Sequence, residues 1–256
     1  MAADSRTPRL AVLIDADNTS ARIASGLFEE IAKIGEASVR RIYGDFSGAS
    51  LKGWSDILST HAIIPHQNFA YVPGKNASDI ALVIDAMDLL HSGRFDGFCL
   101  VSSDSDFTRL AARIREQGTD VYGFGAQKTP QSFRQACRRF IYTENLLPEA
   151  PKPDKAEPLE AAQSKALKPP SSATPLIRKA IDQLEEGSDW APLSRIGQLL
   201  VNLFSDFDPR TYGHEKLRDL VEKTGAFEIK KEEGRGVYIR AKPSGGKPST
   251  QKKPSA

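Results

Sequence analysis

The sequence predicts an α/β protein, in which a parallel β-sheet lies between helices, followed by a small winged helix-turn-helix domain. Short apolar runs alternate with segments of helical spacing along residues 8–147, as in parallel-sheet proteins. Residues 148–173 are rich in Pro, Ala and Lys and contain no aromatic side chain, which is typical of a linker. Beyond them, three helical segments precede two short β-like segments.

The strands of the first domain are expected at the apolar runs, and its helices where apolar residues recur every three or four positions. Strand candidates are residues 10–15 (LAVLID), 39–46, 62–69, 97–102 (GFCLVS) and 120–124. Helices are expected at residues 20–34, 51–59, 77–91 and 106–117. On the helix 77–91 we expect one apolar side, formed by Ile80, Val83, Ile84, Met87 and Leu90.

The second domain is expected at residues 174–241. Its helices are predicted at 175–186, 193–204 and 212–224, and its strands at 227–231 and 236–239. Residues 242–256 resemble the linker in composition but are more basic, so we expect a disordered basic tail that can attract phosphates or simply aid solubility.

Composition places the chain among ordinary soluble proteins. Of its 256 residues, 39% are hydrophobic and 27% charged, and the net charge is only +2. No apolar run is long enough to cross a bilayer, and the first residues lack the apolar core of a signal peptide, so a cytoplasmic location is expected. Cys99 and Cys137 lie in apolar or helical contexts, which favours buried thiols over a disulfide or a zinc site.

Polar and acidic side chains follow the two best strand candidates, at the point where each strand ends. They are Asp15, Asp17 and Asn18 after the first strand, and Ser102, Asp104 and Asp106 after the other. Asp79 opens the helix 77–91 and faces the same edge if that helix begins there. Ligands of doubly wound sheets bind at the carboxyl ends of the strands, so these groups are expected to lie close together.

Such a cluster of carboxylates is costly unless a cation neutralises it, and oxygen-only ligands suit Mg²⁺ or Mn²⁺ better than zinc. A metal of this kind supports phosphodiester hydrolysis, because it lowers the pKa of an attacking water and stabilises the leaving oxygen. The competing interpretation of each single acid is a helix cap, for which Asp104, Ser103, Asp17 and Asn18 are all suited.

Three segments resemble the signatures of the NYN domain, a branch of the PIN-like nucleases. They are LIDADN (13–18), KNASDIALVIDAM (75–87) and LVSSDSDFTRLAARIREQGTDVYGFG (100–125). The resemblance implies a Rossmann-like sheet and a Mg²⁺- or Mn²⁺-dependent ribonuclease site.

The residues that match the family's acids are Asp15, Asp79, Asp104 and Asp106, for which the resemblance implies metal binding and catalysis. Supporting positions are Asn18, Ser102, Asp17 and Asp85. Asp85 is the weaker candidate, because six residues separate it from Asp79 and a regular helix does not bring them to one face. Lys75 could hold a phosphate.

The second domain resembles the LOTUS or OST-HTH module in PLSRIGQLL (192–200), FDPRTYGHEKLRDLVEKTGAFEI (207–229) and GVYI (236–239). The resemblance implies binding of RNA, including structured or G-rich RNA, and in some relatives binding of a protein. Candidate RNA contacts are Tyr212, His214, Lys216, Arg218, Lys230, Lys231 and Arg235. An equally good interpretation of Tyr212 and His214 is that they pack the turn of the helix.

The sequence therefore predicts a metal-dependent ribonuclease with a C-terminal RNA-binding module. Two other classes remain open: an RNA-binding adaptor that cleaves nothing, and a phosphatase or nucleotidase acting on small phosphate esters. The intact set of acids favours catalysis, and the appended winged helix favours a polymeric substrate. A second copy of the chain could complete a shallow site of this kind, so a homodimer is a further expectation.

Overall fold

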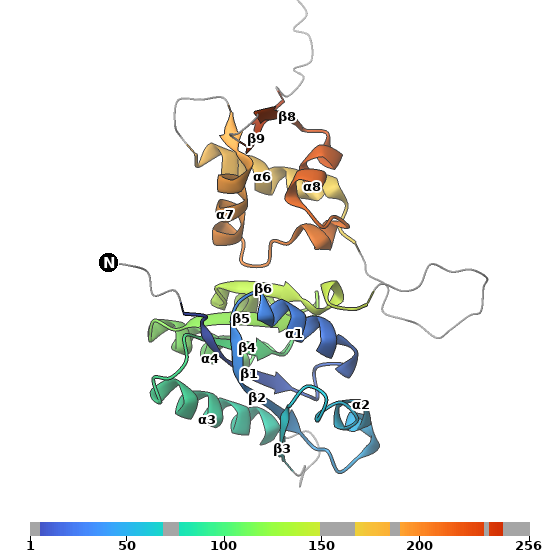
Figure 1. Ribbon diagram of the computed structural model, residues 1–256, viewed down its shortest axis with the longest axis vertical. Helices are drawn as coiled ribbons and strands as arrows, with labels where there is room; N and C mark the ends of the chain where they lie inside the picture. Colours follow the sequence, from blue (N-terminus) through green and yellow to red (C-terminus); the bar gives the residue numbers. More distant parts are fainter. Residues whose placement is uncertain (1–5, 69–76, 149–166, 185–189, 233–235, 243–256) are drawn as a thin grey trace, which may run out of the picture. The chain divides into compact units, whose positions relative to one another are not determined.

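The computed structural model describes residues 6–68, 77–148, 167–184, 190–232 and 236–242 (Figure 1). These residues form two units. The first contains the described residues up to 148 together with Phe204–Thr211, and the second contains the others from Leu167 onward. The expected linker lies largely outside the described residues, and so does the expected basic tail apart from Lys242.

The first unit is built on a parallel sheet, which has six strands in the described part of the chain. Their order is β3-β2-β1-β4-β5-β6. The strands are β1 (Arg9–Asp15), β2 (Glu36–Gly44), β3 (Ile64–Gln67), β4 (Gly97–Val101), β5 (Asp120–Gly125) and β6 (Arg139–Tyr142). The strand order reverses between β1 and β4, which pair in register from Leu10 with Gly97 to Ile14 with Val101. The carboxyl ends of β1 and β4 therefore form the topological switch point of the sheet.

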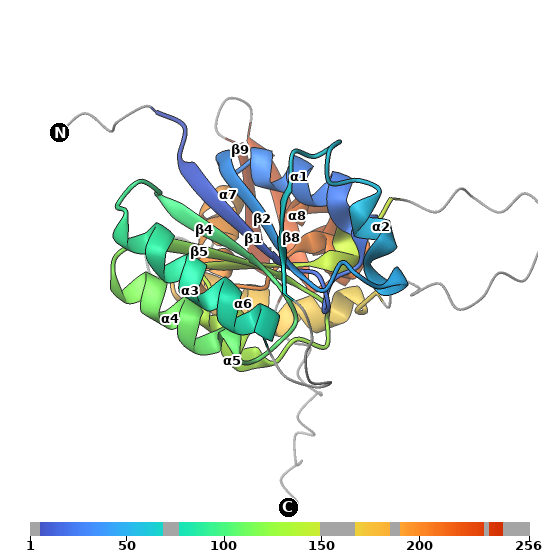
Figure 2. The same ribbon diagram turned by 90° about the horizontal axis from the view of Figure 1, so that it is seen from below.

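Helices cover both faces of this sheet (Figure 2). One face carries η1 (Ala21–Ile23), α1 (Ala24–Ala32), η2 (Ala49–Leu51) and α2 (Lys52–Ser55), and the other α3 (Ala77–His91), α4 (Phe107–Glu116) and α5 (Gln131–Ala136). The side chains of β1 alternate between two buried cores. Val12 packs in the core that contains Leu27 of α1, and Leu13 in the core that contains Leu110 of α4. This two-sided burial explains why β1 and β4 are apolar almost throughout.

The predicted apolar side of α3 is wrong in part: Val83, Met87 and Leu90 are partly buried and pack against the core, but Ile80 and Ile84 do not. Leu82, Ala86 and Leu89 are the buried residues of this helix, whereas Ile80 and Ile84 are 61% and 58% exposed. The helix carries apolar residues on more than one side, so spacing alone included two exposed residues and missed the three that are most buried. Both cysteines are free and buried, as predicted.

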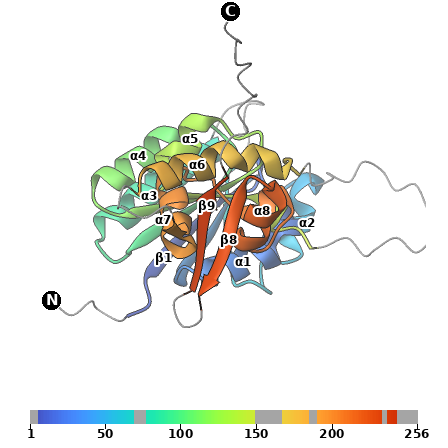
Figure 3. The same ribbon diagram turned by 90° about the horizontal axis from the view of Figure 1, so that it is seen from above.

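The second unit has helices η4 (Pro170–Ala173), α6 (Thr174–Asp182), α7 (Leu193–Leu203) and α8 (Leu217–Thr224). A small antiparallel sheet has the order β7-β9-β8, formed by β7 (Ala191–Pro192), β8 (Phe227–Glu232) and β9 (Gly236–Ala241). Figure 3 shows β8 and β9 running side by side as the wing. No helix in the described part of either unit has the length and apolar character needed to span a membrane.

Two boundaries of the second domain differ from expectation. Residues 170–173 are not linker, because they form η4, in which Ala173 is completely buried. The helix expected at 212–224 begins only at Leu217. Gly213 has a positive φ of 82°, and Lys216 is extended at the N-cap, so a regular helix cannot run through this stretch.

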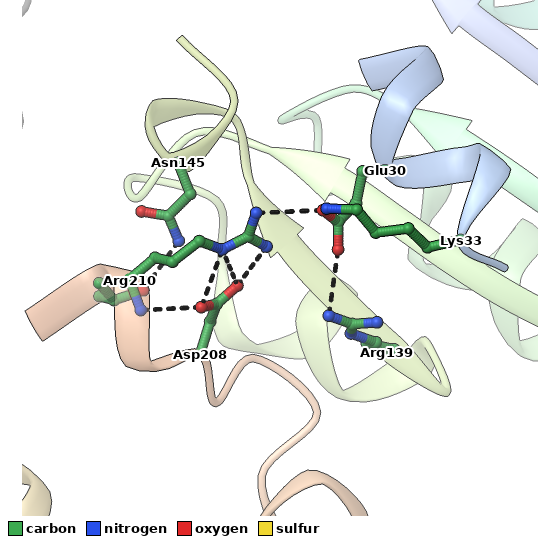
Figure 4. Close-up of polar contacts among 7 residues, drawn as sticks. Glu30, Lys33, Arg139, Asn145, Asp208 and Arg210 are labelled. Carbon is green, nitrogen blue, oxygen red and sulfur yellow. Dashed lines mark hydrogen bonds and ion pairs between the residues drawn. The ribbon is translucent and has the colours of Figure 1, made fainter. Parts of the chain in front are cut away.

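The segment Phe204–Thr211 groups with the first unit although its neighbours in sequence belong to the second. Arg210 of this segment donates a hydrogen bond to the Glu30 carboxylate at 3.0 Å and another to Asp208 within the segment (Figure 4). Glu30 is 3% exposed and accepts further hydrogen bonds from Lys33 at 3.0 Å and Arg139 at 3.2 Å. One buried carboxylate is thus shared by three basic side chains.

A second set of contacts joins the same segment to α5 and β6. Asp206 accepts hydrogen bonds from Arg134 and from the hydroxyl of Tyr142. The backbone N–H of Phe140 on β6 donates to the carbonyl of Ser205 at 2.7 Å. The segment therefore extends the hydrogen bonding of the edge strand β6.

Candidate active site

Five acids gather at the carboxyl ends of β1 and β4, and we call this group the acidic edge: Asp15, Asp17, Asp79, Asp104 and Asp106. Asp15 is its buried member. It closes β1, is 1% exposed, and accepts hydrogen bonds from Ser102 Oγ at 2.7 Å and Asn18 Nδ2 at 2.8 Å. Burial raises the pKa of Asp15, and the hydrogen bonds from Ser102 and Asn18 oppose this rise only in part. Because Ser102 directly follows β4, this bond joins the carboxyl ends of the two central strands.

Asp79 lies in the first turn of α3 and faces the same edge. Its pKa is raised to about 6, first by burial and then by the charges of Asp15, Asp104, Asp17 and Asp106. Such an effect requires that the carboxylates lie near one another. A hydrogen bond from Ser78 Oγ to Asp17 Oδ2, at 3.2 Å, also ties the start of α3 to the loop after β1.

The loop after β4 brings the remaining two acids to this edge. The backbone N–H of Asp104 donates to Ser102 Oγ at 3.0 Å, and the N–H of Asp106 donates to Asp104 Oδ1 at 2.9 Å. Asp104 therefore does stabilise the turn that begins α4, as the helix-cap interpretation expected. This bond uses one carboxylate oxygen, and Asp104 still contributes its charge to the cluster around Asp79.

Asp85 lies in a different environment. It accepts hydrogen bonds from Arg41 and from the hydroxyl of Tyr43, both on β2. Burial alone would raise the pKa of Asp85, but these two hydrogen bonds and the charge of Arg41 outweigh it, and the pKa is lowered. Unlike Asp79, Asp85 is already neutralised by an ion pair with Arg41. Its contacts indicate a structural role and not membership of the acidic edge.

The residues proposed to bind RNA in the second unit are spread over α8 and the wing. Lys216 and Arg218 are exposed at the start of α8, and Lys230 on β8 pairs with Glu232 at 2.7 Å. Tyr212 is only 7% exposed, so its ring is not available to stack on a base. Lys231 is exposed and His214 partly exposed. Lys75 and Arg235 lie outside the described residues.

The acidic edge has the ligand chemistry that Mg²⁺ and Mn²⁺ prefer, because its donors are carboxylate oxygens. Among the described residues, no three acidic, His or Cys side chains are arranged to enclose a metal ion. Mg²⁺ commonly keeps several waters and takes only one or two carboxylates directly, together with substrate phosphates. The donor set therefore fits a hydrated ion rather than a fully protein-enclosed one.

A cavity of about 320 Å³ adjoins the acidic edge, with Asn18 and Ser103 in its wall. No pattern in the sequence pointed to its two basic residues, Arg22 and Lys128. Arg22 lies in η1 and Lys128 in the loop after β5, and only the folding of the sheet brings these two segments together. The strand-end rule could have suggested them, because Lys128 follows β5 as Asp104 follows β4.

A parallel sheet with carboxylates at its topological switch point defines the α/β class of PIN-like domains. The NYN domain family matches residues 9–147, and the chain belongs to this family. The OST-HTH/LOTUS domain family matches residues 168–239. NYN is a PIN-like nuclease domain, and the OST-HTH/LOTUS domain binds RNA.

Solved structures give only distant likenesses. A protein of unknown function from Vibrio parahaemolyticus is 20% identical with a TM-score of 0.46, and the match covers 56% of this chain and 96% of that one. An uncharacterized protein from Nitrosomonas europaea is 29% identical with a TM-score of 0.28, and the match covers 38% of this chain and 96% of that one. No match was found among curated proteins.

Proposed function

We propose that this protein is a metal-dependent ribonuclease that hydrolyses RNA phosphodiester bonds at Asp15, Asp79, Asp104 and Asp106. The observation that carries the proposal is the meeting of carboxylates from β1, the β4 loop and α3 at the switch point of the sheet. Membership of the NYN family supports nuclease chemistry, and the OST-HTH/LOTUS domain supports RNA as the substrate.

Mg²⁺ or Mn²⁺ would bind beside these four aspartates, with one or two of them as direct ligands and the others bonded to its waters. When bound, the ion supplies an activated water and stabilises negative charge on the reacting phosphate. Asp15 has a fixed orientation, because Ser102 and Asn18 both donate to its carboxylate. Asp104 is positioned in turn by its own N–H bond to Ser102. Ser102 is therefore the side chain that aligns the acids of the two central strands.

The test is cleavage of a labelled single-stranded RNA by the full-length chain with Mn²⁺, compared with an EDTA control. Asp104→Asn should reduce the rate by roughly 100-fold or more, because the variant binds less tightly the metal ion that stabilises the developing negative charge. Asp88→Asn is the matched control, since Asp88 is an exposed acid of α3 away from the cluster. It should cleave as the wild type does.

Two outcomes would overturn the proposal. If the wild type binds RNA but leaves it intact with either metal, the chain is an adaptor. If it hydrolyses a small phosphate ester such as p-nitrophenyl phosphate and leaves RNA intact, it is a phosphatase.

The contribution of the second unit to RNA binding can be tested separately. Replacing Lys216 and Arg218 by glutamine removes two exposed charges at the start of α8. RNA affinity should fall and become less dependent on salt, because fewer phosphates are neutralised. The rate at saturating RNA should stay near that of the wild type. An unchanged affinity would assign RNA binding elsewhere.

A further inference from the structure

The cavity beside the acidic edge is built from the loops at the carboxyl ends of the central strands. Asn18 and Arg22 follow β1, Ser103 follows β4 and Lys128 follows β5, while Glu144 and Leu147 close the cavity from the stretch after β6. Its volume of about 320 Å³ lies at the lower end of the range for small-ligand sites. A space of this size suits one nucleotide better than a longer segment of RNA.

The cavity and the acidic edge share structural parts. Asn18 lines the cavity and also donates to Asp15 at 2.8 Å. Ser103 lines it from the loop that carries Asp104, and its Oγ accepts from the N–H of Ala126 at 2.8 Å. A ligand in the cavity would therefore lie next to the candidate catalytic acids.

The charge of the cavity is opposite to that of the acidic edge. Arg22 and Lys128 are both exposed, and within the described part of the chain neither has an ion-pair partner. Glu144 is the acid of the wall, and its Oε1 accepts from the N–H of Gln127 at 2.9 Å, which anchors the loop that carries Lys128. Two cations beside a carboxylate cluster suit an RNA strand with two neighbouring phosphates. One phosphate would bind Arg22 and Lys128, and the next would bind the metal ion.

One part of the wall is apolar. Ile23 and Leu147 both line the cavity, but Ile23 is only 3% exposed, so the partly exposed Leu147 provides the accessible apolar surface. An apolar surface beside two phosphate-binding cations is suited to the flat face of a base. Thr19 and Ser20 also line the cavity. The Thr19 hydroxyl donates to the Val101 carbonyl at 3.3 Å and can still accept a hydrogen bond, whereas the Ser20 hydroxyl accepts from the Arg22 N–H at 3.4 Å and can still donate one to ribose or base.

We propose that this cavity binds one nucleotide of the RNA, adjacent to the bond that is cut, with its phosphate held by Arg22 and Lys128 and its base against Leu147. This inference rests on the proposed ribonuclease function and assigns it a substrate subsite. It makes Arg22 and Lys128 substrate-binding residues of the first unit, separate from the RNA-binding second unit.

The experiment measures binding of a short fluorescein-labelled single-stranded RNA to the full-length chain by anisotropy, in EDTA, over a series of salt concentrations. The variants are Arg22→Gln and Lys128→Gln, singly and together. Arg113→Gln is the matched control, because Arg113 is an exposed arginine on α4 that pairs with Glu116. Thermal melting verifies that each variant is folded.

The double variant should bind RNA roughly tenfold more weakly, as expected when hydrogen bonds to a charged group are removed. The slope of log affinity against log salt should become shallower by about 0.7 for each phosphate that the protein no longer neutralises. Arg113→Gln should change neither quantity. If the double variant and the control agree in both, the subsite is refuted.

Cleavage with Mn²⁺ separates this inference from the proposed function. If the wild type cleaves while the double variant binds and cleaves as the control does, the function holds and the subsite is wrong. If no protein cleaves but the double variant loses affinity and salt dependence, the subsite holds and the nuclease function is wrong. Loss of both binding and cleavage efficiency in the double variant supports both.

Discussion

Replacing Glu30 by glutamine removes the negative charge shared by Lys33, Arg139 and Arg210 while keeping the size of the side chain. Removing one partner of a buried ion pair costs about 3–5 kcal/mol, because the remaining charge is left uncompensated. Here the Glu30 side chain is 4% exposed, but Arg210 and Arg139 are 26% and 34% exposed, so water can solvate them in part. We therefore expect a loss of about 2–3 kcal/mol in the free energy of unfolding of the first unit.

The assay is urea unfolding followed by the fluorescence of Trp54, which is 2% exposed in the first unit. A Trp190→Phe background removes the other tryptophan, so the signal reports on the first unit alone. In thermal melting the same loss corresponds to roughly 4–12 °C for a unit of this size. The neighbouring Glu29→Gln is the matched control, since Glu29 is exposed, and it should change stability by less than about 0.5 kcal/mol.

The effect of Glu30→Gln should depend on pH in one direction. Burial alone would raise the pKa of Glu30, but the Lys33 hydrogen bond and the charges of Arg210 and Arg139 outweigh it, so the pKa falls below 4.5. A carboxylate with a lowered pKa stabilises the fold above its unfolded pKa and loses this contribution as pH falls through the folded one. The gap between wild type and variant should therefore be full at neutral pH and shrink in acid. A variant as stable as Glu29→Gln at neutral pH would refute the reasoning.

Three further predictions follow from the first unit. Leu82→Ala should cost about 2–5 kcal/mol in unfolding free energy, whereas Ile80→Ala should cost under about 0.5, and equal losses would contradict the observed face of α3. Asp104→Asn should lower the pKa of Asp79 from about 6 in metal-free protein, because one repelling charge is removed; an unchanged carboxyl NMR titration would mean that the two acids are not coupled. Both cysteines should react with a thiol reagent only upon unfolding, because burial raises their pKa, and fast reaction of the native protein would contradict this.

The sequence predicted the helices and strands whose apolar pattern is long or uniform. β1 and β4 are apolar because both faces of the sheet are covered, and α3 was predicted over its whole length. α5 (Gln131–Ala136) and β6 (Arg139–Tyr142) were missed because each is too short to show a period. Phe204–Thr211 was assigned to the second domain because nothing local distinguishes it from its neighbours.

The residues of the candidate site at the carboxyl ends of β1 and β4 could be predicted from the strand pattern of the sequence, and those that lie elsewhere could not. Asp15 and Asp104 follow from that rule, whereas Asp79 lies on a helix and was identified through the NYN resemblance. Arg22 in η1 and Lys128 in the loop after β5 were missed, because a lone basic residue carries no spacing signal. Tyr212 was proposed because it lies among basic residues, with packing of the helix turn as an equally good interpretation, and its burial favours the packing interpretation.

The contact between Glu30 and Arg210 joins residues that are 180 positions apart in the chain. Contacts so distant in sequence form late in folding, since a large loop must close before they are made. During synthesis, Glu30 and the sheet strands leave the ribosome long before Arg210 does. Until then, among the residues that the structure describes, Lys33 and Arg139 are the partners that compensate the charge of the Glu30 carboxylate. The contacts of residues 204–211 with the rest of the first unit can therefore form only after this segment has been made, and not when the sheet of the unit is complete.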